Sequence, residues 1–242
     1  MFLEFITVNQ FKSIYLQLLV TRFTIGNLEM EDKNTDLASS KRSMELYTNM
    51  KAFSDIVEKN PNKISPYDLI DIAHTVNGEI YDRGFRKTQV SVKKAKKFTP
   101  LAAKRIPEAI YSLFDAYHNI WNDLNVYERE AKLHIELVRM QPFEDGNKRT
   151  ARILTNFNLL KNNKAPIVIT EDQTEEYFKY IDEYDVESLA KLFRKNSIEE
   201  LEVMMNLFEK ICGCIDITNT ECEDTDVKLY KYVRERKEKI NN

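Results

Sequence analysis

A short loop in the middle of the sequence gathers the residue types that bind phosphate. Three cations follow an acidic turn that contains glycine, in the order Glu144, Asp145, Gly146, Asn147, Lys148, Arg149 and Arg152. The turn ends where a helical pattern begins, and a helix start carries unpaired N–H groups and the positive end of the helix dipole. Gly146 lets the backbone approach a ligand, and Arg149 and Arg152 are three residues apart and are predicted to share one helix face. These features predict an anion site suited to phosphate.

Two residues of the turn add to this site. Asp145 is placed to hold Mg²⁺, which binds carboxylate together with phosphate oxygens. Asn147 tolerates an unusual backbone conformation or caps the helix. The alternative is an ordinary helix–loop–helix with a solvated, charged start, and a Gly-Asn turn alone favours that interpretation. The clustering of one acid, the Gly-Asn pair and three cations within eight positions favours the anion site.

Helices must position this loop, because apolar residues recur at helical spacing on both sides of it. Pro142 ends the helix that precedes the loop. The predicted helices cover residues 1–59 with a break at 26–35, 64–77, 104–121, 128–140, 148–162, 172–195 and 198–212, and residues 228–242 form a charged helix or a frayed end. A short strand or hairpin is predicted where polar and apolar residues alternate, at Gln89, Val90, Ser91 and Val92.

The composition fits a globular, helical protein. Hydrophobic residues make up 43% of the 242 residues and charged residues 31%, and only 5 Gly and 6 Pro are present, too few for the many turns of an all-β fold. We therefore predict an all-α fold with an N-terminal helical region at 1–60, a central domain at 61–195 and a C-terminal helical extension at 196–242. The net charge of −3 argues against a nucleic-acid partner.

Neither the N-terminus nor the cysteines indicate export. Residues 1–23 lack a basic start and a cleavage site and are too polar to span a bilayer, so we expect an amphipathic helix and no membrane partner. Cys212, Cys214 and Cys222 are an odd, clustered set without a nearby His, which argues against a disulfide framework and against a zinc site. Reduced thiols and a cytoplasmic location are expected.

The loop and its flanks resemble the signature of the Fic/Doc (Fido) family, His-x-Phe-x-(Asp/Glu)-Gly-Asn-(Gly/Lys)-Arg-x-x-Arg. The positions that match in register are Phe143, Asp145, Gly146, Asn147, Arg149 and Arg152. His134 and the apolar helices around the loop are similar as well. Gly84-Phe85-Arg86 loosely resembles the family stretch that precedes the flap, one spacer residue short. The resemblance covers about residues 64–183.

The resemblance implies a Fic-type helical bundle with a short β-hairpin flap over the site. Most members are similar in transferring AMP from ATP to a hydroxyl side chain of a target protein. It further implies a nucleotide site, with Mg²⁺ on Asp145 and the phosphates of ATP on Gly146, Asn147, Lys148, Arg149 and Arg152. Flap residues 89–92 are expected to hold a target segment as an added strand. Lys148 replaces the commoner Gly and resembles a branch that includes phosphate-transferring members, so the transferred group stays open.

The first motif position departs from the family. Family members carry His there, which takes the proton from the attacking hydroxyl, whereas this sequence has Gln141. An amide cannot accept that proton, and general-base catalysis contributes about 10²–10⁴-fold. His134 lies about 10 Å away along the helix axis, too far to substitute, and Glu144 is nearer although alternate loop residues tend to point apart. We therefore expect weak transfer or none.

A second segment resembles a family motif whose key residue is changed. Many Fic proteins carry an inhibitory helix with the pattern (Ser/Thr)-x-x-x-Glu-(Gly/Asn), and Thr21, Ile25 and Gly26 occupy its defined positions. Ile25 stands where the pattern has Glu. Loss of the base and loss of the inhibitory carboxylate are mutually consistent, because a protein with little transferase activity has little to restrain.

Two functions remain open on the sequence alone. The first is a slow Fic-type enzyme, either a protein adenylyltransferase or a related phosphoryl transferase. The second is a non-catalytic module that binds a nucleotide or a peptide and acts through partners. Both imply a nucleotide and a protein partner, which is a target protein or an antitoxin-like protein. A structural helical protein whose loop only resembles the motif is a third and more distant alternative.

Overall fold

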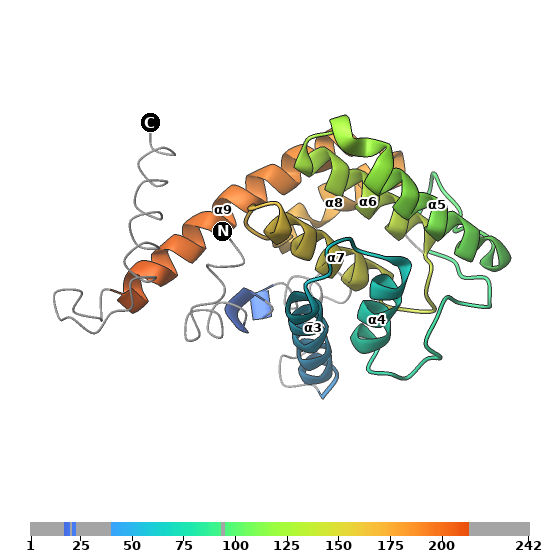
Figure 1. Ribbon diagram of the computed structural model, residues 1–242, viewed down its shortest axis with the longest axis horizontal. Helices are drawn as coiled ribbons and strands as arrows, with labels where there is room; N and C mark the ends of the chain where they lie inside the picture. The colour runs from blue at the N-terminus through green and yellow to red at the C-terminus, as the bar shows by residue number, and fades with distance from the viewer. Residues whose placement is uncertain (1–16, 20, 23–39, 93–94, 213–242) are drawn as a thin grey trace.

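The computed structural model describes residues 17–19, 21–22, 40–92 and 95–212 (Figure 1). These residues form helices joined by loops, and no β-strand occurs among them. The α-helices are α3 (Ser40–Lys59), α4 (Pro66–Val76), α5 (Ile106–Asn119), α6 (Val126–Met140), α7 (Asn147–Lys161), α8 (Thr174–Glu183) and α9 (Val186–Cys212). Short 3₁₀ turns are η1 (Ala103–Arg105), η2 (Trp121–Asp123) and η3 (Glu171–Gln173). The predicted all-α class is confirmed.

Several predictions lie outside the described residues. They include the break at 26–35, the tail at 228–242, and Ile25, Gly26, Cys214 and Cys222. Within the described chain, no helix is long and apolar enough to cross a membrane.

Two helices beside the loop begin with reciprocal caps that the sequence encodes. At the start of α4, Asp68 N donates to Ser65 Oγ at 3.3 Å, and Ser65 N donates to the Asp68 carboxylate at 2.8 Å. Asn125 and Glu128 make the same two bonds at the start of α6, both at 3.1 Å. Such caps satisfy N–H groups that the helix itself leaves unpaired. They therefore fix the residues at which α4 and α6 begin.

Helix α7 is the central element of the bundle. Its residues 149–160 are all buried, and it packs against α3, α4 and α6 (Figure 1). A helix buried on every side must find internal partners for its polar side chains. Asn156 bonds the backbone N and O of Ile167 at 2.7 and 3.1 Å, and Asn158 donates to the buried Glu130 carboxylate at 2.9 Å. Because α7 is held on all sides, the loop that begins it is held as well.

The predicted helices are confirmed along the described chain, with one error in their boundaries. The sequence predicts a break at Asn196 and Ser197, but the chain instead breaks at Tyr184, which has φ 59°, and α9 then runs without interruption. Asn196 Nδ2 donates to Val168 O at 2.8 Å, and Ser197 Oγ donates to Ala165 O at 2.7 Å. Their polar side chains therefore bind a neighbouring segment and do not cap a new helix. Helix α9 also crosses the predicted boundary of the C-terminal extension, and the division into three regions stays a prediction.

The predicted hairpin is not seen in the described part of the flap. Among the described residues, 89–92 run as a loop without a strand partner, and Ala95 N donates to Val92 O at 3.1 Å. A strand needs a ladder of backbone bonds to a neighbouring strand. At the start of the flap the backbone bonds another loop instead, because Arg86 N donates to Pro142 O at 2.9 Å.

Candidate functional site

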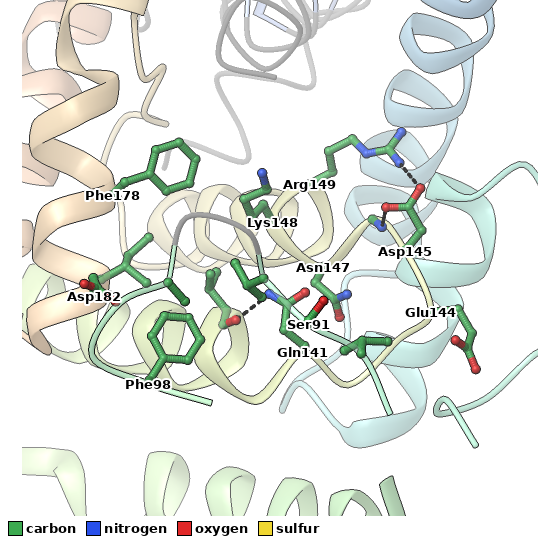
Figure 2. A pocket seen from close by; sticks show the side chains of 16 residues that line it. Ser91, Phe98, Gln141, Glu144, Asp145, Asn147, Lys148, Arg149, Phe178 and Asp182 are labelled. Carbon is green, nitrogen blue, oxygen red and sulfur yellow. Dashed lines mark hydrogen bonds and ion pairs between the residues drawn. The ribbon is translucent and has the colours of Figure 1, made fainter. Parts of the chain in front are cut away.

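A pocket of about 330 Å³ opens at the start of α7 (Figure 2). Its walls come from the flap, the end of α6, the loop, the first turn of α7 and α8. In Figure 2, Phe98 and Phe178 lie on one side of this pocket and Asp145 and Arg149 on the other, with Gln141 between them. The structure therefore brings the predicted loop and the flap residues Val90, Ser91 and Val92 to one cavity.

The fourth predicted flap residue lies outside the pocket wall. Gln89 is not among the lining residues, and its Nε2 donates to Pro100 O at 3.2 Å. Its predicted contact with a target segment stays a prediction.

The loop is held by bonds between its own ends. Gln141 ends α6 with φ 51°, and its Nε2 donates to Val138 O at 2.5 Å. Phe143 N donates to Asn147 Oδ1 at 2.8 Å, and Asn147 Nδ2 donates to Phe143 O at 2.9 Å. Both ends of the Asn147 amide thus shape the loop, and the second N–H of Nδ2 is the donor that this side chain can offer to a phosphate. No side chain caps the first turn of α7, so its positive dipole end faces the pocket.

Gly146 occupies a position that a side chain does not fit. Its φ is 71°, and a Cβ atom there would lie 2.5 Å from Asn77 Oδ1 and 3.0 Å from Val76 Cγ1. The Asn77 side chain is itself held, because its Nδ2 donates to Asp145 O at 3.0 Å. Helix α4 and the residue that follows it therefore press directly on the loop. Glycine is required here both by the backbone angle and by the space.

Arg149 lies between two carboxylates. Its Nη1 is 3.6 Å from Glu45 Oε1 on α3, and its Nη2 is 3.6 Å from Asp145 Oδ2. The Arg149 and Glu45 side chains are only 9% and 12% exposed, so salt screens this pair weakly. A bound phosphate would compete with Glu45 for the guanidinium. Sequence reasoning missed Glu45, because it lies far upstream on a helix that carries no motif.

Asp145 is suited to a divalent cation. Its side chain is 65% exposed, and its Oδ1 accepts a hydrogen bond from Gly146 N at 2.6 Å. No group of three or more His, Cys, Asp or Glu side chains gathers anywhere in the described chain. Mg²⁺ binds through one or two carboxylates plus substrate phosphates and water. One exposed carboxylate beside an anion loop fits that ion, and does not fit a metal held by protein ligands alone.

The remaining two cations have different neighbours. Lys148 lines the pocket, and its Nζ lies 5.1 Å from the centre of the Phe178 ring. Arg152 is buried and is not among the lining residues, and its guanidinium lies 5.1 Å from the centre of the Tyr177 ring. Arg149 and Arg152 lie three residues apart on α7, but their side chains end at different neighbours, Glu45 of α3 and Tyr177 of α8. A phosphate contact by Arg152 stays a prediction.

A buried polar network lies next to Arg152. His134 has Nδ1 3.0 Å from Thr155 Oγ1 and Nε2 2.7 Å from Tyr177 OH. Burial, together with the positive charge of Arg152, lowers the pKa of His134 to about 3, so the ring is neutral at physiological pH. His134 is therefore a packed residue and does not substitute for the missing base.

The start of the flap is anchored by a buried arginine. Arg86 is 4% exposed, and its guanidinium donates to four backbone carbonyls, those of Gln141 (2.6 Å), Thr88 (2.5 Å), Met140 (3.4 Å) and Leu101. The Arg86 guanidinium thus provides hydrogen-bond donors for backbone carbonyls at the end of α6 and on both sides of the flap. The sequence pointed to this residue through the Gly84-Phe85-Arg86 stretch, although not to its contacts.

Two carboxylates hold the flap on either side of the pocket. Glu144 accepts a hydrogen bond from Thr88 Oγ1 at 2.8 Å, which occupies the carboxylate nearest in sequence to Gln141. Asp182 Oδ1 accepts bonds from the backbone N of Lys96 and Lys97 at 2.8 and 2.9 Å. The bond from Lys97 N is the largest of the effects that lower the pKa of Asp182. The chain just before flap residues 89–92 is therefore tied to the loop, and residues 96 and 97 are tied to α8.

Only part of the segment that resembles an inhibitory helix is described. Thr21 Oγ1 donates to Gln17 O at 2.6 Å, which is a bond within its own helical turn. Ile25 and Gly26 lie outside the described residues. The degenerate inhibitory role of this segment stays a prediction.

Comparison with known proteins identifies the region around the loop. Residues 63–159 match the model of the Fic/DOC family. Protein adenylyltransferase fic-1 of Caenorhabditis briggsae is 32% identical over 132 residues, which are 51% of this chain and 24% of that protein. Protein adenylyltransferase Fic of Nematostella vectensis is 30% identical over 142 residues, 54% of this chain and 30% of that protein. The chain thus spans less than a third of the length of these relatives.

Solved structures share the fold. A Fic domain containing signaling protein from Bacteroides thetaiotaomicron matches with a TM-score of 0.71 at 18% identity, over 85% of this chain and 94% of that one. Fic-1 from Caenorhabditis elegans matches with a TM-score of 0.62 at 20% identity, over 85% of this chain and 65% of that one. The resemblance drawn from the loop and the Fic-type helical fold are both confirmed.

Proposed function

We propose that this chain, whose residues 63–159 are a Fic/DOC-family domain, binds ATP with Mg²⁺ at the start of α7 and transfers AMP to a protein hydroxyl only slowly. One observation carries the proposal. The phosphate-type loop, the flap and Gln141 line the same pocket, and Gln141 stands where the family has its catalytic His. The residues that suit phosphate are present in this pocket, whereas the residue that would accept a proton is replaced by Gln141.

Nucleotide binding is supported by the charges around the loop. The uncapped start of α7, Lys148 and Arg149 all present positive charge to the pocket. Asp145 is the carboxylate that would hold Mg²⁺, and the ion when bound neutralises charge on the phosphates. Binding must displace Arg149 from Glu45, so part of the interaction energy is spent on breaking that pair.

Gln141 sets the limit on catalysis. Its Nε2 donates one N–H to Val138 O, so its Oε1 and the second N–H remain to meet a hydroxyl in the pocket. An amide oxygen can orient that hydroxyl but cannot take its proton. Loss of a general base slows such a step by about 10²–10⁴-fold. His134 is buried and does not take over this role, and the Glu144 carboxylate lines the pocket while accepting a hydrogen bond from Thr88.

The acceptor side of the proposal rests on the flap and on the relatives. Val90, Ser91 and Val92 lie over the pocket, where an extended target segment would place its hydroxyl near the loop. The curated relatives are named protein adenylyltransferases, and for this chain a protein hydroxyl is the corresponding substrate class. An antitoxin-like partner and transfer of a phosphoryl group, which Lys148 leaves open, belong to the same proposal.

A second candidate is a non-catalytic module that binds a nucleotide or a target peptide. The replacement of the family His by Gln141 favours it. The two candidates share the nucleotide site and differ in turnover. Transfer of label from ATP to a protein would support the slow enzyme, and its absence would support the non-catalytic module.

Calorimetric titration with ATP and Mg²⁺ tests the shared site. Arg149→Ala is expected to weaken binding by about tenfold or more, because a hydrogen bond to a charged group contributes about 1.5–3 kcal/mol. Arg105→Ala removes an exposed cation at the start of α5 and serves as the matched control, with no expected change. Thermal melting of both variants confirms that they fold. Equal affinity of Arg149→Ala and the parent would show that the loop is not the nucleotide site.

A further inference from the structure

A second groove lies at the opposite ends of α6 and α7 from the loop. Its volume is about 1130 Å³, and it is bounded by the turn after α5, the first turns of α6, the end of α7 and the first turns of α9. The nearest lining residues of the two sites on α6, Lys132 and Val138, are six residues apart, about 9 Å along the helix axis. The groove and the pocket at the loop share no lining residue.

Positive charge dominates this groove. Cationic side chains outnumber carboxylates among its lining residues, with Arg129, Lys132, Lys164, Lys191 and Arg194 against Glu128 and Glu187. The whole chain, by contrast, carries a net charge of −3. Positive charge is therefore concentrated in this groove, although the chain as a whole is slightly negative.

The two carboxylates of the groove neutralise only Lys191 among its five cations, and Arg129 lies 3.8 Å from the buried Glu130 carboxylate. Glu128 is occupied by the backbone N of Asn125 at 3.1 Å, and Glu187 by Lys191 Nζ at 2.6 Å. Lys132, Lys164 and Arg194 form no ion pair with any residue in the described ranges. These three positive charges are available to an anionic partner.

The cations form two rows on neighbouring helices. Arg129 and Lys132 are three residues apart on α6, and Lys191 and Arg194 are three residues apart on α9. Residues at this spacing share a helix face, and α6 and α9 pack against each other. Lys164, just after α7, adds a fifth cation. The groove is also lined by apolar and aromatic side chains, namely Leu124, Val126, Tyr127, Tyr184, Val186 and Ala190.

An elongated anion fits this arrangement better than a compact one. Small-molecule sites typically hold about 300–1,000 Å³, and the groove exceeds that range with its charges spread over three elements. The starts of α6 and α9 add no open anion site, because Asn125 caps the first and Asp185 accepts Ser188 N at 2.9 Å in the second. The two rows of cations, and not the helix ends, therefore define the ligand.

We propose that this groove docks an acidic, extended segment of a partner protein. Carboxylates at alternate positions of such a segment meet the α6 row and the α9 row, and the side chains between them pack on Tyr127 and Tyr184. Peptide recognition of this kind is independent of the nucleotide loop. The inference therefore goes beyond the proposed function and stands or falls separately from it.

Fluorescence anisotropy with the full chain and no nucleotide tests the proposal. The probe is a labelled short peptide of alternating Glu and Ala, and its matched control carries Gln in place of Glu. The Glu peptide is expected to bind with an affinity that falls as salt rises from about 50 to about 200 mM, because salt screens exposed charges. The double variant Lys164→Glu/Arg194→Glu is expected to weaken binding at least about tenfold.

A second double variant controls for overall charge. Lys104→Glu/Arg105→Glu makes the same charge change on exposed residues at the far end of α5, about 21 Å along that helix from the groove. It is expected to keep most of the affinity. Equal weakening by the two double variants, or no salt-dependent binding of the Glu peptide, overturns the proposal.

Two other occupants are distinguished in the same experiment. Direct binding of labelled single-stranded DNA that is tighter than that of the Glu peptide and is lost in Lys164→Glu/Arg194→Glu would assign the groove to nucleic acid. Self-association of the parent that is lost in the same variant would assign it to a second copy of the chain. Either result would contradict an acidic protein segment as the ligand.

Discussion

Replacing Gly146 with alanine is expected to destabilise the protein by about 2–3 kcal/mol, and two separate costs contribute. The backbone cost arises because φ is 71°, a left-handed conformation that costs a residue with a Cβ atom about 1 kcal/mol or more. The contact cost arises because the new Cβ would lie 2.5 Å from Asn77 Oδ1. Asn77 must then move and lose its bond to Asp145 O, a loss of about 1 kcal/mol.

Gly78 offers a matched control for the backbone cost alone. Its φ is 63°, but a Cβ there would lie 3.7 Å from its nearest neighbour, Thr48 Cγ2, which is ordinary contact. Gly78→Ala is therefore expected to cost about 1 kcal/mol. Equilibrium urea unfolding measures both variants, and the extra cost of Gly146→Ala should shrink in an Asn77→Ala background. Equal losses for the two glycine variants would refute the claim that α4 constrains the loop.

Two carboxylates give further predictions. Glu45→Gln is expected to tighten ATP binding severalfold, because it removes a mostly buried negative charge 3.6 Å from Arg149, whereas Glu58→Gln, exposed on the same helix, should change nothing. Calorimetry compares the two, and equal affinities would contradict the competition between Glu45 and phosphate. Burial raises the pKa of Glu130 from 4.5 to about 7. The folded protein therefore keeps a proton that the unfolded chain releases in this window, and stability should fall as pH rises through it. Glu130→Gln should remove that fall in urea unfolding curves, and an unchanged slope would reject the assignment.

The helices beside the loop could be predicted because local signals specify them. Apolar spacing gave their faces, Pro66 stands at the start of α4, and Pro142 follows the end of α6. The predicted break at Asn196 and Ser197 failed because polar residues inside a pattern usually mark a helix end. Here their side chains bond the backbone of a distant segment, and only tertiary packing decides that.

The candidate site divides in the same way. The loop could be predicted because its phosphate-binding residue types follow one another in the sequence. Alignment with the family motif also showed that Gln141 stands in place of His. Glu45, Asn77 and Arg86 reach the site from other elements, so no local pattern could place them. The neighbours of Arg152 were likewise unpredictable, because helical spacing gives a direction but not the side chain that lies there.

Restoring histidine at position 141 tests most directly whether this site binds nucleotide but lacks its base. The assay follows label from ATP labelled on its α-phosphate into protein hydroxyls, for the parent, Gln141→His and Gln141→Ala. Gln141→His is expected to transfer about 10²–10⁴-fold faster than either of the others. Adding Arg149→Ala to Gln141→His should abolish the gain. A parent that transfers as fast as Gln141→His, or a Gln141→His variant that binds ATP and gains nothing, would contradict this account.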